Sequence, residues 1–168
     1  LHPVIITKAI KLMALAGLVE DSIGILRNAQ ASGYKKINVL HYNAALTACR
    51  NHKRYENGLE LFDEMPSFGI KPDRVSISLA IHMLGKVGSW EKALHLYESV
   101  DETAHDNALL LQIMSCLTRN NQAAKSFGIY QSAKVKWDSE TSAALFTAAL
   151  IALIELEPPK TFPRGQKS

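Results

Sequence analysis

The sequence lacks long hydrophobic runs and contains very little cysteine. None of its apolar stretches reaches the 18 or more residues that a membrane-spanning helix needs. The longest candidate, 143–156, is too short and ends in acidic residues, so we expect a buried helix there and no membrane span. Its two cysteines, Cys49 and Cys116, lie 67 residues apart and each falls inside a helical pattern. This arrangement favours two reduced core thiols over a disulfide scaffold.

Charge of one sign and metal-ligand spacings are also scarce. A net charge of +3 over 168 residues is low for a protein that grips nucleic acid mainly through its phosphates. The six histidines show no metal-site spacing; His41 and His52, for example, are eleven residues apart. We therefore expect no metal, no cofactor and no small-molecule substrate.

The sequence does contain an internal repeat. When the chain is shifted by 35 residues against itself, six positions of 55–65 fall on residues of similar character in 90–100. Their spacing follows one face of an α-helix, and 42–49 repeats in the same way at 77–84. Each unit is expected to be two helices joined by a turn, at 51–53 and at 85–89. Because neither helix can bury its apolar face alone, the units must stack.

Weaker matches extend the repeat in both directions. They predict helices near 4–16, 19–32, 104–118, 121–134 and 139–156; the next helix after Val100 is expected near Thr103, which lowers the offset to about 30. The predicted fold is all-α, an α-solenoid of about four helix-turn-helix hairpins plus a C-terminal capping helix. The repeat domain is expected over 1–156, with units near 3–38, 39–73, 74–102 and 103–138. The proline-bearing segment 157–168 is expected to be an extended or disordered tail.

One unit carries motifs of a known family. Residues 39–73 contain YNAAL at 42–46, LELFDEM at 59–65 and GIKPD at 69–73. These motifs and their spacing resemble the pentatricopeptide repeat, whereas the opening motif of the tetratricopeptide repeat is missing. The next unit is similar through GSWEKALHLYESV but lacks the KPD loop. The resemblance covers roughly 3–156 and implies a superhelix of stacked hairpins.

The resemblance also implies residues that contact RNA. Proteins of this family bind single-stranded RNA, one base per repeat, and read the base with the fifth and last residues of a repeat. The implied base-reading residues are Thr7, Asn38, Asn43, Asp73, Ser78 and Asn107. The pair Asn43 and Asp73 implies uracil, and the pair Thr7 and Asn38 is similar to adenine-reading combinations. The partner of Ser78 is expected near Glu102.

Further contacts follow from the same resemblance. The second residue of a repeat sandwiches the base, and Leu40 and Val75 match that apolar requirement. Arg50 and Lys86 are candidates for phosphate contacts, because the first helices of the repeats are the more basic ones. Asn43 and the cations each have an alternative explanation. Asn43 can instead cap or brace its hairpin, and Arg50 and Lys86 can belong to ordinary solvated helix faces.

Catalysis is not expected. The deaminase-like enzymes of this family need H-x-E with C-x-x-C, and neither motif occurs; nuclease types need a separate domain for which the chain has no room. A non-catalytic binding module remains, with two functions open. One is single-stranded RNA binding for RNA processing, stability or translation. The other is a protein–protein scaffold or accessory subunit of a large organelle complex, such as a ribosome or a photosynthetic or respiratory assembly. The family implies a mitochondrion or plastid, after removal of a transit peptide.

Overall fold

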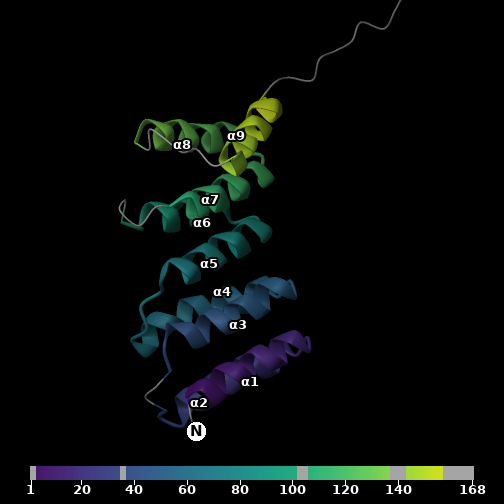
Figure 1. The fold of residues 1–168 in the computed structure, drawn as a ribbon, viewed down its shortest axis with the longest axis vertical. Coiled ribbons are helices and arrows are strands. Elements are labelled where there is room, and N and C mark those ends of the chain that lie inside the picture. The colour runs from purple at the N-terminus through teal and green to yellow at the C-terminus, as the bar shows by residue number, and fades with distance from the viewer. Residues whose placement is uncertain (1–2, 35–36, 102–105, 137–142, 157–168) are drawn as a thin grey trace, which may run out of the picture.

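The described residues form a stack of helical hairpins (Figure 1). The computed structural model describes residues 3–34, 37–101, 106–136 and 143–156, which contain nine α-helices, one 3₁₀ helix and no strand. The helices are α1 (Pro3–Leu15), α2 (Val19–Ala31), α3 (Val39–Asn51), α4 (Tyr55–Glu64), the 3₁₀ helix η1 (Met65–Phe68), α5 (Arg74–Lys86), α6 (Trp90–Glu98), α7 (Asn107–Arg119), α8 (Ala123–Lys136) and α9 (Ala143–Leu156). The predicted all-α solenoid is confirmed.

The helices alternate between two structural roles. We call α1, α3, α5, α7 and α9 the A helices, and α2, α4, α6 and α8 the B helices. Each A helix packs on the next A helix, and each B helix packs on its own A helix and on the following one. This arrangement makes one continuous array, in which every hairpin covers the apolar face of its neighbour. In Figure 1 the hairpins follow one another along the long axis, from purple α1 and α2 to yellow α9.

The repeat length is more regular than the sequence suggested. The A helices begin at residues 3, 39, 74, 107 and 143, which are 36, 35, 33 and 36 residues apart. The expected offset of about 30 in the third unit was wrong, because α7 begins at Asn107 and not near Thr103. Asp106 fixes this start, since its carboxylate accepts a hydrogen bond from the Leu109 N–H at 2.9 Å and so caps the helix.

The four turns within the hairpins share one backbone feature. Gly17, Lys53, Gly88 and Asn121 each have a positive φ, between 58° and 81°, two residues after the end of an A helix. Such a residue ends a helix and lets the following N–H groups bond to its last carbonyls. The predicted turn at 85–89 therefore begins later than expected: Gly85 lies inside α5, and Gly88 makes the turn.

The core runs along the whole stack and divides at α5. Leu79 and Met83 of α5 join the buried cluster formed with α1 to α4. Ile81 and Leu84 of the same helix join the cluster formed with α6 to α9. A helix that is apolar on two sides is what an internal element of a stack requires. The array is therefore held together by burial between neighbours, and not by one central core.

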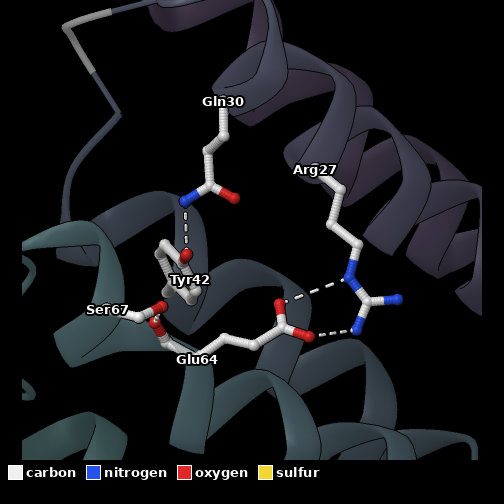
Figure 2. Close-up of polar contacts among 5 residues, drawn as sticks. All are labelled: Arg27, Gln30, Tyr42, Glu64 and Ser67. Atoms are coloured by element: carbon white, nitrogen blue, oxygen red, sulfur yellow. Dashed lines mark hydrogen bonds and ion pairs between the residues drawn. The ribbon is translucent and has the colours of Figure 1, made fainter.

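Polar contacts brace the first two units on the side of the B helices (Figure 2). Arg27 of α2 forms an ion pair with Glu64 of α4, and Gln30 of α2 donates a hydrogen bond to the Tyr42 hydroxyl of α3. The Ser67 hydroxyl donates to the Glu64 carbonyl oxygen at 2.6 Å, which ties η1 to the end of α4. The contacts of Arg27 and Gln30 fix how the first hairpin sits on the second.

The thiols agree with their prediction. Cys49 and Cys116 are free and buried, and burial raises the pKa of each thiol to about 11, so both remain protonated at neutral pH. The last helix was expected to be buried, which is wrong for one side of it: Ala149 and Ala152 are buried, but Leu150, Ile151, Leu153 and Ile154 are exposed. The closing helix α9 begins at Ala143, and 137–142 lie outside the described residues, as does the predicted tail 157–168. Within the described ranges, no helix has the length and apolarity to cross a bilayer.

Candidate nucleic-acid interface

The last residue of a repeat is the residue that caps the next A helix. Asn38, Asp73 and Asp106 immediately precede α3, α5 and α7, and each accepts a hydrogen bond from a backbone N–H of the first turn. Capping and base contact both need the same chemistry, an exposed side-chain oxygen at a helix start. Each of these side chains therefore has a structural role as a helix cap. The cap uses only one of its oxygen lone pairs, so the others can accept further hydrogen bonds.

Asn43 and Asp73 lie in direct contact. The Asn43 amide N–H donates to both carboxylate oxygens of Asp73, at 3.0 and 3.1 Å. Its amide oxygen accepts a hydrogen bond from the Ser76 hydroxyl at 2.6 Å. Asn43 is thus held in one orientation by the last residue of its own repeat and by Ser76 of the following one. The predicted alternative for Asn43, bracing of the hairpins, is part of what this side chain does.

The Asp73 carboxylate stays ionised in this network. Partial burial raises the pKa of Asp73, but hydrogen bonds from the Ser76 N–H, the Asn43 amide and the Ser76 hydroxyl outweigh it. The pKa is therefore below its ordinary value. A carboxylate in this state accepts hydrogen bonds only, so it selects for a partner that offers an N–H.

A groove of about 940 Å³ opens between α1 and α3 beside this pair. It is lined by six of the residues that the sequence singled out: Thr7, Asn38, Leu40, Asn43, Asp73 and Val75. Leu40 and Val75 are both more than half exposed. The groove thus combines solvent-facing apolar side chains with hydrogen-bonding groups, a combination that suits a flat, polar-edged ring.

Equivalent positions extend this pattern along the A helices. The second residues of α1, α3 and α5 are Val4, Leu40 and Val75, all exposed and all lining the groove. The sequence interpretation missed Val4, although its place follows once α1 is known to begin at Pro3. The fifth residues are Thr7, Asn43, Ser78, Leu111 and Thr147.

Because α7 begins at Asn107, two residues of the third and fourth units do not occupy the repeat positions that the sequence analysis gave them. Asn107 is the first residue of α7, and Leu111 stands where Asn43 stands in α3. Glu102 lies outside the described residues, and Asp106 is the cap that corresponds to Asp73. Asp106 also forms an ion pair with Arg74 at 2.8 Å. The missed signal is an acidic residue directly before the apolar helix sequence of 107–117.

Three cations gather at the opposite ends of the A helices. Arg50, Lys86 and Arg119 lie in the last turns of α3, α5 and α7 and are exposed. Burial lowers the pKa of His82, and the positive charges of Lys86, Arg119 and Arg50 lower it further. Among the described residues none of the three is ion-paired to a carboxylate. Arg119 was not predicted, although it occupies the same place in α7 that Lys86 occupies in α5.

Metal-ligating side chains do not converge in the described part of the chain. No group of three or more His, Cys, Asp or Glu side chains is placed there to hold an ion. The chemistry that these surfaces offer is therefore hydrogen bonding, apolar contact and positive charge.

Comparisons with known proteins agree with this geometry. Residues 24–87 match the pentatricopeptide repeat domain. A mitochondrial pentatricopeptide repeat-containing protein of Arabidopsis thaliana is 36% identical over 50% of this chain and 12% of its own length. The small ribosomal subunit protein mS78 of the same organism is 32% identical over 56% of this chain and 24% of its own.

Solved structures show the same fold. The pentatricopeptide repeat protein PPR10 from maize superposes with a TM-score of 0.71, at 17% identity, over 88% of this chain and 21% of that protein. Its complex with an 18-nucleotide PSAJ RNA element gives a TM-score of 0.69 at 14% identity, over 88% and 22% of the two chains. The chain spans 11% to 26% of the length of the curated relatives it matches. By its repeat motif, its stacked hairpins and these matches, the chain is similar to proteins of the pentatricopeptide repeat family, and residues 24–87 match the repeat domain itself.

Proposed function

We propose that this array binds single-stranded RNA, with bases inserted between the second residues of neighbouring A helices. The observation that supports this most is the groove between α1 and α3, because it is lined by exposed apolar side chains and by the Asn43–Asp73 pair together. A base that stacks between Leu40 and Val75 would bring its edge to that pair. A second base between Val4 and Leu40 would meet Thr7 and Asn38.

The chemistry of each pair suggests its base. The ionised Asp73 accepts hydrogen bonds and is already oriented by Asn43 and Ser76. Uracil offers one ring N–H between two carbonyls, so it can donate to an acceptor of this kind. Thr7 and Asn38 together offer both donors and acceptors, which suits the donor and acceptor edge of adenine.

The array beyond the second unit offers less to a base. Ser78 is the fifth residue of α5, and the residue that would read a base with it is Asp106, whose carboxylate forms an ion pair with Arg74. Asn107 lies one turn before the fifth position of α7. In α7 that position is Leu111, which has no hydrogen-bonding side chain. Each stacked and bonded base contributes on the order of 1–3 kcal/mol. We infer that binding by this chain is weak, favours two adjacent bases, and relies on Arg50 and Lys86 at the phosphates.

A transplanted pair tests the proposal. Asn43→Thr with Asp73→Asn gives unit two the pair that unit one already has. Fluorescence anisotropy at low salt would compare labelled U-rich and A-rich oligonucleotides for the two proteins. We expect the parent chain to favour U in one subsite and the variant to shift towards A, with roughly a tenfold change in the ratio of affinities for about 1.4 kcal/mol of discrimination. Failure of the parent to bind any RNA, or an unchanged base preference, would overturn the proposal.

The likeness to a ribosomal protein favours a second function. A 32% identity to mS78 over 56% of the chain and the loss of a polar fifth residue in α7 both suit a protein-binding subunit of a mitochondrial ribosome. In that case the chain would co-sediment with small ribosomal subunits in a sucrose gradient, and the Asn43→Thr, Asp73→Asn variant would co-sediment equally well. Loss of co-sedimentation in that variant alone would argue against a scaffold role. Neither function requires catalysis, and we propose a non-catalytic binding module that acts in mitochondria.

A further inference from the structure

The third unit contains an ion pair that has no counterpart in the second unit. Arg74, the first residue of α5, contacts Asp106, the residue before α7, with 2.8 Å between Nη1 and Oδ2. Asp106 uses its other oxygen, Oδ1, to cap α7. The ion pair therefore takes the carboxylate oxygen that the cap leaves free.

The second unit holds its carboxylate in a different way. The residue that corresponds to Arg74 is Val39, which has no charge, and Asp73 is bound instead by the Asn43 amide. The fifth residue of α3 thus contacts the last residue of its repeat. The fifth residue of α5 is Ser78, and within the described ranges no hydrogen bond joins it to the carboxylate before α7.

The third unit nevertheless offers the groups of a base-binding site. Val75 and Ala108, the second residues of α5 and α7, are both apolar and exposed. Ser78 offers a hydroxyl, which both donates and accepts, and Asp106 offers a carboxylate, which accepts. The free oxygen of that carboxylate is the one a base edge needs, and Arg74 binds it.

The chemistry of Arg74 indicates which base can take its place. A guanidinium presents several N–H donors in one plane, and a carboxylate can accept two of them side by side. The Watson–Crick edge of guanine presents N1–H and N2–H side by side in the same way, and its O6 lies next to them as an acceptor for a hydroxyl. The edges of adenine, cytosine and uracil do not carry two neighbouring N–H groups. A guanine edge therefore resembles the group that already occupies Asp106.

The ion pair is exposed enough to be displaced. The side chains of Arg74 and Asp106 are 59% and 36% exposed. Ion pairs of this kind contribute little net free energy, because water and salt screen the charges. Two hydrogen bonds from a base to an ionised carboxylate are individually stronger than neutral ones, so a base that fits can replace the arginine.

We propose that Ser78 and Asp106 form a third base-binding site, specific for guanine, which Arg74 closes when no base is bound. This inference rests on the proposed binding of single-stranded RNA. It adds a control that lies outside the second, fifth and last residues of a repeat, since Arg74 is the first residue of its helix. It also accounts for an array in which two sites are open and the next one is closed.

Arg74→Ala tests the proposal, because it opens the site and leaves Ser78 and Asp106 in place. Fluorescence anisotropy would measure labelled oligonucleotides with the cores A-U-X and X-U-A, in which X is each of the four bases; the two orders cover both strand polarities. We expect the ratio of affinities for guanine and adenine at X to rise about fivefold in the variant, which corresponds to about 1 kcal/mol. The ratio cancels the general loss of affinity that follows from removing a positive charge.

Two further variants identify the groups responsible. Lys71→Ala removes an exposed positive charge from the loop before α5 and should leave the ratio unchanged. Arg74→Ala combined with Asp106→Asn should lose the gain, because one of the two acceptor oxygens becomes an N–H donor, while the remaining oxygen can still cap α7. Circular dichroism checks folding, and Arg74→Val, which copies unit two, repeats the experiment if the alanine variant unfolds.

The outcomes separate this proposal from RNA binding itself. An unchanged ratio in both Arg74 variants, an equal gain in Lys71→Ala, or a gain that survives Asp106→Asn would each overturn the third site while the parent still binds RNA. A parent that binds none of the oligonucleotides would overturn the proposed function, and the third site with it.

Discussion

Single residues at the repeat boundaries are proposed to have two roles, helix capping and base contact, and both use a side-chain oxygen as a hydrogen-bond acceptor. Asn38, Asp73 and Asp106 cap the A helices that follow them, and the proposed base contacts use oxygens of the same side chains. Asp73 shows the overlap most clearly, because its carboxylate caps α5 and also orients Asn43. A substitution there is expected to change stability and RNA preference together.

The stability contribution of Asp73 should depend on pH. Its pKa is below the ordinary value because hydrogen bonds outweigh burial. Its contribution is therefore complete above the unfolded-state pKa of about 3.9 and is lost as the pH falls through the lower folded-state pKa. Asp73→Asn keeps a capping oxygen but removes the charge. We expect the variant to be less stable than the parent at pH 7, and the gap to close below about pH 3.9.

Urea unfolding followed by circular dichroism at pH 7 and at pH 3 would measure this gap. Asp63→Asn, at an exposed carboxylate in α4, is the control and should show little difference at either pH. A gap for Asp73→Asn that persists or widens at pH 3 would contradict the assignment.

The presence of the helices could be predicted from the sequence far better than the exact residue at which each helix begins. The 35-residue offset located the helices because six apolar positions recur on one helical face. The register failed at 101–107, where Asp101, Thr103 and Asp106 are all capable of capping a helix. The chain caps at Asp106, which moves Leu111 into the position assigned to Asn107. The contact between Asn43 and Ser76 was equally invisible, since it joins residues 33 positions apart.

Close approach between helices explains why a glycine occupies α4. A Cβ on Gly58 would lie 2.4 Å from the Met83 sulfur and 2.9 Å from the Cys49 Cβ, both on fully buried side chains. Glycine normally weakens a helix by about 1 kcal/mol relative to alanine. Here the missing side chain lets α3, α4 and α5 pack together, and the packing outweighs that loss.

Substitution of this glycine should therefore go against helix propensity. Gly58→Ala is expected to lower the free energy of unfolding by about 1–3 kcal/mol through overpacking. Gly24→Ala, in the B helix α2, is the matched control because no atom lies within 4 Å of its added Cβ; it should raise that free energy by up to about 1 kcal/mol. Thermal or urea unfolding measures both. Equal and stabilising effects of the two substitutions would show that α4 is not held as closely as described.

On the scale of the whole molecule, the side chains proposed to contact bases and the side chains proposed to contact phosphates lie at opposite ends of the A helices. Apolar and hydrogen-bonding side chains lie at the starts of the A helices, and the cations Arg50, Lys86 and Arg119 lie at their ends. A cation in the last turn also interacts favourably with the helix dipole. Each of the three is therefore stabilised at its place, although none pairs with a carboxylate of the described residues. This separation explains how a chain with a net charge of only +3 can still present a basic row.

The salt dependence of RNA binding should locate that row on the phosphates. For a single strand, the slope of log K against log salt changes by about 0.7 for each phosphate neutralised. Replacing Arg50, Lys86 and Arg119 by alanine should therefore flatten the slope by about 2, while Asn43→Thr with Asp73→Asn should leave it unchanged. Arg54→Ala is the control, because Arg54 is already paired with Glu20 at 3.6 Å. An unaltered slope in the triple variant would mean that the phosphates lie elsewhere, since a row that neutralises them must release counterions when RNA binds.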